Sequence, residues 1–295
     1  MSEYVGVDVS KKRLDVAIAL SGEQLQVDNN PAGVAQLVAW LSPRTLTRIV
    51  VEASGGWERP VLDGLWLAEL PVARVNPGWV RYFARGLGRQ AKTDTIDAAL
   101  LAEYGRLAGP RLTERPSEPV ALLEGLVNRR RQLVDMLTQE KNRRHTLPPA
   151  SGDSLERHIR FLEQEADQLK TQIEALIERT PELKQRSDLL RTAPGVGLIA
   201  VATFLARLPE LGHVNRRRIA ALVGVAPYND DSGGRGKPRR IAGGRADVRT
   251  VLYMITICAI RCNPVIRAFY QHLRAQGKPG KGVSGIVCNQ ETTRV

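Results

Sequence analysis

The spacing of apolar residues changes once along this chain of 295 residues, near residue 117. Before that point, short apolar runs such as YVGVDVS, LDVAIAL and TRIVVEAS alternate with stretches of helical spacing such as PAGVAQLVAWL. From there to Leu189, the apolar runs have helical spacing only. This pattern predicts an α/β domain followed by a helical one. We expect the order β-β-(β)-α-β-α-β-α in the first part, with the third strand optional, opened by a hairpin at SKKR.

The second helical run carries a regular apolar seam that steps by four and three residues. It consists of Leu155, Ile159, Leu162, Ala166, Leu169, Ile173 and Leu176. Apolar residues at this spacing line one side of a helix and pack against another helix. Two interpretations fit the seam: an antiparallel hairpin packed within its own chain, or a coiled coil that dimerises.

The net charge of +12 is confined to the last part of the chain. Residues 1–185 hold 25 basic and 25 acidic side chains, whereas residues 186–295 hold 18 and 6. So strong an excess of one sign attracts polyanions, and the Arg- and Lys-rich loops favour nucleic acid over an anionic membrane. We therefore expect a nucleic-acid partner.

The composition argues against a membrane or secreted protein. No apolar run approaches the roughly 18 residues of a membrane span, and the N-terminus lacks the basic leader and apolar core of a signal peptide. We expect a cytoplasmic protein with free thiols, of which Cys258 and Cys262 lie in the core. Trp57, Trp66 and Trp79 are expected to pack inside the first domain rather than stack on bases.

Four acidic residues point to metal chemistry. Asp8 lies inside the first apolar strand and Glu52 ends another, where a carboxylate is unfavourable unless it is paired or binds a metal. Asp94 and Asp97 are three residues apart at the predicted start of a helix, so both can point toward one spot. Such oxygen ligands suit two Mg²⁺ ions, which can activate the attacking oxygen and stabilise the leaving oxygen at a phosphodiester.

The motifs VGVDVSK, VVEASGG and KTDTIDAALLA, in this order and at these spacings, resemble the DEDD motif of the transposases of the Insertion Sequence 110 and 1111 group, relatives of the Piv DNA invertase. The resemblance covers residues 3–108 and 186–276. It implies a ribonuclease H-like, RuvC-like N-terminal domain with catalytic metal ligands at Asp8, Glu52, Asp94 and Asp97. The other acids of this region, Asp15 and Asp63, are interpreted as ordinary surface residues.

Two glycine-rich stretches in the C-terminal part are candidates for phosphate contacts. Gly195 and Gly197 precede a helical run, and such a turn presents backbone N–H groups to a phosphate. The stretch resembles a helix-hairpin-helix element, with a Schellman-type turn between packed helices as the alternative. The irregular run NDDSGGRGKPRRIAGGRADVR combines glycines with basic residues suited to neutralising phosphates, namely Arg235, Lys237, Arg239, Arg240, Arg245 and Arg249.

Ser232 lies in the same basic run, before two glycines. A serine in a turn is usually only a turn residue. The resembled transposases, however, carry a serine in an SG pair after a GLAP-like stretch, here Val223–Pro227, and that likeness implies that Ser232 attacks the DNA phosphate. The nearest histidine, His213, lies nineteen residues upstream, so no Ser-His pair is evident.

Together these patterns predict three parts and a tail. We expect a ribonuclease H-like catalytic domain at residues 1–108, a helical coiled-coil hairpin or dimerisation segment at 109–185, and a mostly helical transposase domain at 186–276. From residue 277 to 295 the sequence has no period and departs from the resembled pattern, so we expect an irregular, truncated tail.

The implied function is a Mg²⁺-dependent DNA transposase that cuts and rejoins strands through a serine adduct. In the resembled group an element-encoded structured RNA chooses the DNA sequences, so the implied partners are DNA, a guide RNA and further copies of the chain, as a homodimer or homotetramer at the prokaryotic nucleoid. One alternative is a hydrolytic nuclease or junction resolvase, in which water replaces Ser232. Others are an actin-like or sugar-kinase ATPase, because GVDVSKKRLDVAIA resembles that phosphate hairpin, and a non-catalytic nucleic-acid-binding remnant.

Overall fold

The computed structural model of the chain divides into two compact units, Met1–Arg115 and Pro116–Val295, and each is described by itself. The structure describes residues 3–88, 94–146, 148, 151–193, 195–228, 231–232, 235–236, 240–241 and 243–277. For residues 94–96, and for the described positions from 228 to 240, it describes the backbone only.

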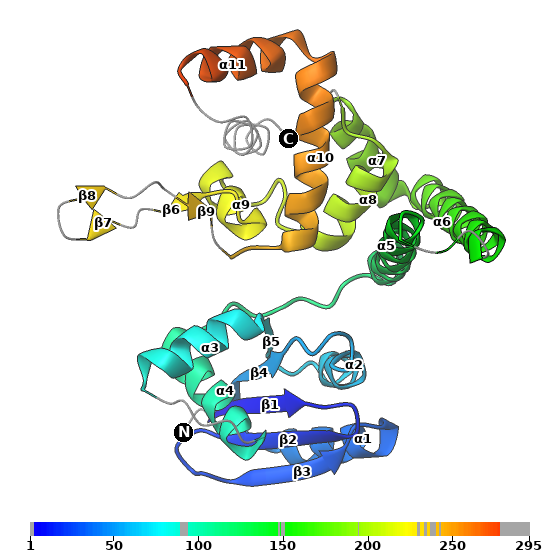
Figure 1. Cartoon of the computed structure of the whole chain (residues 1–295). Coiled ribbons are helices and arrows are strands. Elements are labelled where there is room, and N and C mark those ends of the chain that lie inside the picture. Colours follow the sequence, from blue (N-terminus) through cyan, green and yellow to red (C-terminus); the bar gives the residue numbers. More distant parts are fainter. Residues whose placement is uncertain are drawn as a thin grey trace. The chain divides into compact units, whose positions relative to one another are not determined.

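The first unit is built on a five-stranded mixed sheet (Figure 1). Its strands are β1 (Glu3–Val9), β2 (Arg13–Ile18), β3 (Gln24–Asp28), β4 (Leu46–Glu52) and β5 (Val72–Val75), in the spatial order β3-β2-β1-β4-β5. Strands β1, β2 and β3 form an antiparallel meander, whereas β1, β4 and β5 run parallel. The α/β layer expected from the sequence is confirmed, and the expected hairpin joins β1 to β2.

Helices cover both faces of this sheet. They are α1 (Pro31–Leu41), α2 (Arg59–Leu67), α3 (Pro77–Gly86) and α4 (Asp94–Ala108). On one face, fully buried Leu37 of α1 and Leu65 of α2 share a core with Val5 and Val7 of β1. On the other face, α3 and α4 pack over Val50 of β4 and Val75 of β5, with Val80 and Leu101 among the buried residues. The predicted order of elements is confirmed.

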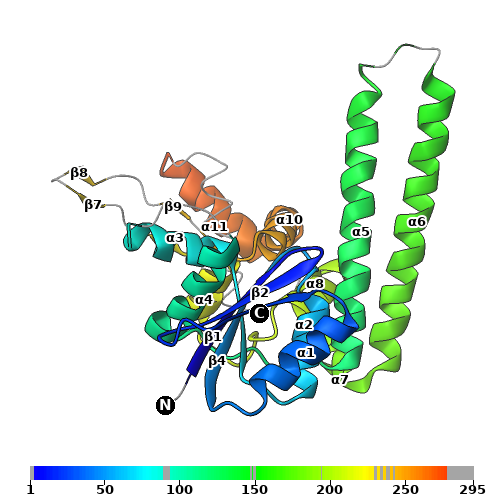
Figure 2. The ribbon, with the colours of Figure 1, turned by 90° about the horizontal axis from the view of Figure 1, so that it is seen from below.

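The second unit opens with a long helical hairpin of α5 (Glu118–Arg143) and α6 (Gly152–Arg179), which lie side by side (Figure 2). The heptad seam of α6 faces α5 of the same chain. Leu133 packs with Leu162 and Ala166 along the shaft. At the other end, Leu123 and Ile173 join the core of the helices that follow. The interpretation as a hairpin within one chain is confirmed, and dimerisation stays a prediction.

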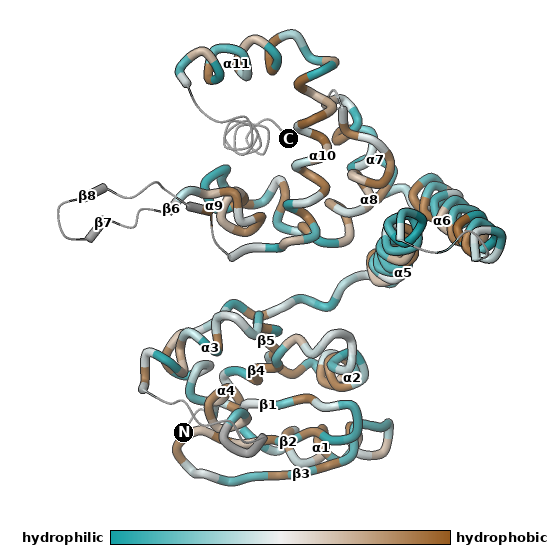
Figure 3. Tube along the Cα trace, in the orientation of Figure 1, coloured by the Kyte–Doolittle hydropathy of each residue, from teal (hydrophilic) through white to brown (hydrophobic). Residues whose placement is uncertain are grey.

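The remaining helices pack around α8 (Leu198–Arg207), in which seven consecutive residues from Ala200 to Ala206 are buried. They are α7 (Pro181–Arg191), α9 (Arg216–Val223), α10 (Ala246–Cys262) and α11 (Pro264–Ala275). Figure 3 shows brown, apolar residues along β1 and β2 and along α10, whereas α5 is mostly teal and hydrophilic. Because the base of the hairpin shares its core with α8, the structure joins it to the C-terminal helices in one unit, and the boundaries at 108 and 185 stay predictions.

The basic glycine-rich run is more regular than expected. Short strands β6 (Pro227–Tyr228) and β9 (Arg240–Ile241) pair antiparallel, and so do β7 (Asp231–Ser232) and β8 (Arg235–Gly236). These two strand pairs, labelled in Figure 1, are together called the ribbon. The expectation of an irregular stretch is wrong for these strand residues, because their backbone groups pair across neighbouring strands, which the sequence pattern does not show.

Two expectations about buried side chains are also wrong. Trp57 is 48% and Trp79 59% exposed, whereas Trp66 is partly buried and donates its Nε1–H to the Thr113 carbonyl at 2.9 Å. Cys258 and Cys262 are exposed on α10 rather than in the core. Within the described residues, no single helix is long and apolar enough to cross a membrane, and α10 and α11 pass that test only as a pair bent by 98°.

Candidate active site

The register of the parallel strands places Asp8 and Glu52 side by side. In the ladder between β1 and β4, Gly6 pairs with Val50 and Val7 with Val51, so Asp8 and Glu52 come next at the carboxyl ends of the two strands. Side chains alternate between the faces of a strand, and both carboxylates therefore leave the sheet on the face that carries Gly6 and Val50. Both are partly buried.

Helix α4 crosses this same face with its N-terminus toward the carboxylates. A β-carbon on Gly6 would lie 2.1 Å from the Ala98 carbonyl oxygen, whereas the Gly105 carbonyl, later in the helix, accepts a hydrogen bond of 3.3 Å from Arg48, two residues before Val50 on β4. The helix thus passes from the carboxyl edge of β1 and β4 toward their amino ends. Its first turn, with the partly buried Asp97, is at the edge that carries Asp8 and Glu52.

The four predicted carboxylates are thus placed as follows. The structure brings Asp8, Glu52 and Asp97 to one edge of the sheet. Asp94 begins α4, and its side chain lies outside the described part. Among the described side chains, no group of three or more acidic, histidine or cysteine residues lies close enough together to hold a metal ion. The donor set is nevertheless purely carboxylate oxygen, which is the chemistry that a hard divalent cation prefers.

Asp15 belongs to the same face, and its interpretation as a surface acid is wrong. It stands directly opposite Asp8 in the antiparallel ladder of β1 and β2, is only 8% exposed, and accepts a hydrogen bond of 2.6 Å from Nε2 of Gln26. The signal was available in the sequence, because Asp15 interrupts an apolar strand as Asp8 does. Asp63, in contrast, is exposed as expected.

Glu58 is a second buried acid near this site, and no local sequence pattern singles it out. Its side chain is fully buried at the start of α2. There Oε2 accepts hydrogen bonds from the backbone N–H groups of Ser54 at 3.1 Å and Gly56 at 2.7 Å, and Oε1 pairs with Arg74 of β5 at 2.7 Å. Burial alone raises the pKa of Glu58, but the backbone donors and the Arg74 charge together lower it below its ordinary value. Glu58 therefore fixes the loop that directly follows Glu52.

The candidate nucleophile lies in the second unit. Ser232 is in β7, paired with Arg235 of β8. The structure describes only the backbone of Ser232, Arg235 and Arg240, and Lys237 and Arg239 lie outside the described residues.

The last two arginines of the basic run have partners within the chain. Arg245 makes two hydrogen bonds to the Glu210 carboxylate, at 2.6 and 2.7 Å, and a third to the Arg207 carbonyl at 2.9 Å. Arg249 donates to the Gly243 carbonyl at 2.6 Å. Arg249 also donates to the Gly224 carbonyl at 3.4 Å and so joins the backbone before β6 to the backbone after β9.

Gly195 and Gly197 lie in the turn between α7 and α8. Gly195 has a φ of +96°, a left-handed conformation that favours glycine, and a β-carbon added there would lie 3.5 Å from the Ile255 carbonyl oxygen of α10. Gly197 is the residue before the first turn of α8. Both are exposed, so phosphate contacts at this turn stay a prediction.

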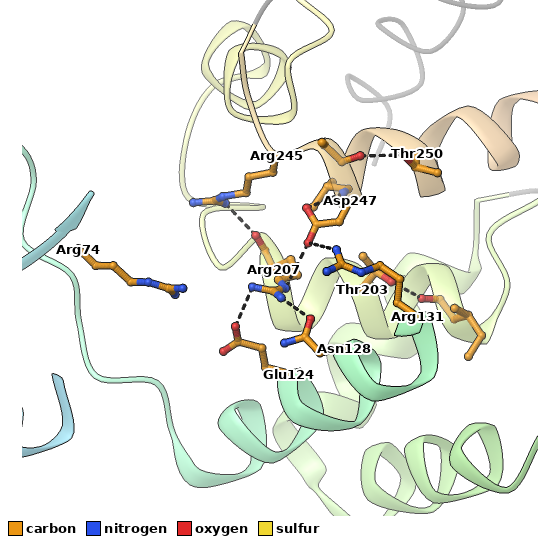
Figure 4. Close-up of polar contacts among 12 residues, drawn as sticks. Arg74, Glu124, Asn128, Arg131, Thr203, Arg207, Arg245, Asp247 and Thr250 are labelled. Atoms are coloured by element: carbon orange, nitrogen blue, oxygen red, sulfur yellow. Dashed lines mark hydrogen bonds and ion pairs between the residues drawn. The ribbon is translucent and has the colours of Figure 1, made fainter. Parts of the chain in front are cut away.

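A polar cluster joins α5, α8 and α10 (Figure 4). Arg207 of α8 pairs with Glu124 at 2.7 Å and with Asp247 at 3.3 Å, and it also donates to Asn128. Arg131 adds a longer contact of 3.7 Å to Asp247. These residues are far apart in sequence, so no local pattern predicts the cluster.

Comparison with known proteins finds two family models along the chain. A family model described as transposase matches residues 5–147, and a second, described as transposase IS116/IS110/IS902 family, matches residues 187–271. The pilin gene-inverting proteins of Moraxella bovis and Moraxella lacunata are each 27% identical to this chain over 290 residues, covering 95% of it and 90% of the relative.

Two more distant likenesses cover part of the chain. The insertion element IS900 uncharacterized 42 kDa protein of Mycobacterium paratuberculosis is 29% identical over 153 residues, or 48% of this chain and 36% of that protein. The structure of T. thermophilus RuvC in complex with a Holliday junction substrate covers 38% of this chain and 100% of its own, with 16% sequence identity and a TM-score of 0.30.

Proposed function

The chain belongs to the IS110 family of transposases, and on that premise we propose that it cuts and rejoins DNA strands with the carboxylates of Asp8, Glu52, Asp94 and Asp97 and the hydroxyl of Ser232. The observation that carries the proposal is the convergence of β1, β4 and the first turn of α4 on one edge of the sheet. Carboxylates gathered at such an edge suit a divalent cation, which the DEDD family implies.

Asp8, Glu52, Asp94 and Asp97 are the residues that would hold the metal, as two Mg²⁺ ions. When bound, the ions would supply charge stabilisation at a phosphodiester. The chain's own contribution is to hold the donors in place: Gly6 lets α4 lie close to the sheet, and Glu58 fixes the loop after Glu52.

Ser232 is the proposed nucleophile. A bond forms between its Oγ and the phosphorus as one strand end leaves with the displaced oxygen, and a strand hydroxyl later displaces Ser232 again. This exchange keeps the number of phosphoester bonds constant, so rejoining needs no ATP. Support comes from the names of the two Moraxella relatives, since inverting a gene requires strands to be rejoined as well as cut.

The nucleic-acid partners follow from the charge. We propose that the ribbon, with Arg235, Lys237, Arg239 and Arg240, contacts phosphates together with the turn at Gly195 and Gly197. Arg245 and Arg249, which have carboxylate or carbonyl partners, position the ends of the ribbon instead. A guide RNA and a homodimer or homotetramer, acting at the prokaryotic nucleoid, complete the proposal.

The test is a search for the serine adduct. The full chain is incubated with Mg²⁺, labelled DNA of the element that encodes it and RNA transcribed from that element. A DNA–protein adduct that is removed by protease and maps to Ser232 is expected, and Ser232→Ala should abolish it. Asp8→Asn and Glu52→Gln should lower cleavage by at least about a hundredfold, whereas the exposed control Asp63→Asn should cut normally.

Each other outcome has a defined meaning. If Ser232→Ala still cuts while Asp8→Asn does not, the chain is a hydrolytic nuclease or resolvase. If neither the wild type nor any variant cuts with RNA, Mg²⁺ and DNA present, the chain is a nucleic-acid-binding remnant. If omitting the RNA changes nothing, the guide-RNA part of the proposal is wrong.

A further inference from the structure

Helix α3 exposes two aromatic rings on one face. Trp79 is 59% and Tyr82 67% exposed, and their ring centroids lie 6.3 Å apart in an edge-to-face arrangement. The opposite face anchors the helix, since Val80 is buried and Phe83 packs edge-to-face on Tyr104 of α4. Trp79 and Tyr82 therefore contribute little to the core, and large aromatic side chains left in water are typical of a binding surface.

The charged residues of α3 are both basic. Arg81 and Arg85 are exposed on the same helix, and the sequence from residue 77 to 92 holds four basic residues and no acidic one. Arginine beside exposed aromatic rings suits a ligand that combines flat apolar groups with negative charge. Unpaired nucleotides have both, because every base has a π-face and every linkage a phosphate.

The position of α3 also relates it to the carboxylates. Strand β5 pairs with β4 so that Val75 lies beside Glu52, and α3 begins two residues after Val75, capped by the Asn76 side chain. The helix thus starts at the edge of the sheet that carries Asp8 and Glu52. A strand that reaches the carboxylates can continue onto α3.

We infer that the surface formed by Trp79, Arg81, Tyr82 and Arg85, the α3 face, binds unpaired nucleotides of a nucleic-acid strand. Bases stack on the two rings, and phosphates pair with the two arginines. The inference rests on the proposed function for the role of the face in strand exchange. Binding itself requires neither catalysis nor the carboxylates, so the two can fail separately.

The test measures affinity of the full chain for three probes in EDTA: a twenty-nucleotide oligo(dT), the matching oligo(U) and heparin, a polyanion without bases. Trp79→Ala/Tyr82→Ala should weaken binding of a single strand about tenfold to a hundredfold and leave heparin binding unchanged. Trp79→Phe should retain most of the affinity. Arg81→Ala/Arg85→Ala should instead lower the slope of log affinity against log salt by about 1.4.

The matched control is Arg157→Ala/Phe161→Ala on α6. It removes an exposed arginine and an aromatic ring that is 54% exposed, and it should bind all probes as the wild type does. Weaker binding of oligo(dT), of oligo(U) or of both, with heparin binding unchanged, supports the inference. The oligonucleotide whose binding is weakened identifies the strand as DNA or RNA. Unchanged affinity for both, or an equal loss for heparin, overturns it, even if the carboxylate variants abolish cleavage.

Discussion

The carbonyl oxygen of Ala98 lies so close to the α-carbon of Gly6 that a β-carbon added there would stand only 2.1 Å away. The same added atom would be 2.4 Å from the backbone nitrogen of Ala102. Both neighbours are backbone atoms of α4, so neither can turn aside. The residue two positions before Asp8 therefore determines how closely the helix that carries Asp97 can approach the sheet.

Gly6→Ala should accordingly destabilise the first unit by about 3 kcal/mol or more, because α4 must move away from β1. All four tryptophans of the chain lie before residue 80, so the urea midpoint followed by tryptophan fluorescence reports on this unit. The control is Gly125→Ala on α5, where no atom lies within 4 Å of the added carbon. That change should leave the midpoint unaltered, and equal midpoints for both variants would show that the close packing is unimportant.

Replacing Glu58 by Gln should destabilise the first unit by about 1–3 kcal/mol at pH 7, because the donors of Ser54 and Gly56 and the Arg74 cation lose a charged acceptor. The folded pKa of Glu58 lies below its ordinary 4.5, so its contribution is present above that value and is lost as the pH falls through the folded pKa. The difference in free energy of unfolding between the variant and the wild type should therefore shrink as the pH falls below 4.5. A difference that is constant from pH 7 to 3 would contradict this.

Replacing Arg207 by Ala should destabilise the second unit by about 3 kcal/mol, because it leaves Glu124 and Asp247 without their shared cation. Circular dichroism at 222 nm follows the helices of this unit, while tryptophan fluorescence should show an unchanged first unit. For comparison, Lys184→Ala removes an exposed ion pair with Glu178 and should change stability by less than about 1 kcal/mol.

Arg245→Ala separates a structural role from phosphate contact. Loss of the two bonds to Glu210 and of the bond to the Arg207 carbonyl should lower the stability of the second unit by about 1–2 kcal/mol. If the Arg245 guanidinium pairs with Glu210 and does not contact a phosphate, the salt dependence of DNA binding should be the same in the variant as in the wild type. A slope reduced by about 0.9 would instead show a direct phosphate contact.

Much of the first unit follows from local sequence. The apolar runs predict the strands and their order. Asp8 and Glu52 are recognisable as candidate metal ligands because their carboxylates interrupt these runs. Charge alone assigns Asp15 to the surface, whereas β2, the strand that carries it, is buried on both faces. Residue type alone assigns Trp79 to the core, although α3 buries only a narrow face.

The partners of the basic side chains cannot be predicted locally, because they lie far away in the sequence. The partner of Arg245 lies 35 residues away, at Glu210, and that of Arg207 lies 83 residues away, at Glu124. A cluster of arginines indicates positive charge, but it does not tell which cations have acidic partners elsewhere in the chain. The phosphate-binding candidates could therefore be identified only as a group.

The α5/α6 hairpin has a further consequence for the backbone amides. Its helices have 26 and 28 residues and so extend about 40 Å, yet only the end with Leu123 and Ile173 shares the large core. Toward the other end the two helices pack chiefly against each other, and surface ion pairs such as that of Arg144 and Glu156 link them. Deuterium uptake should therefore rise steadily from the base of the hairpin to its far end, and the far end should open many times before the rest of the unit unfolds.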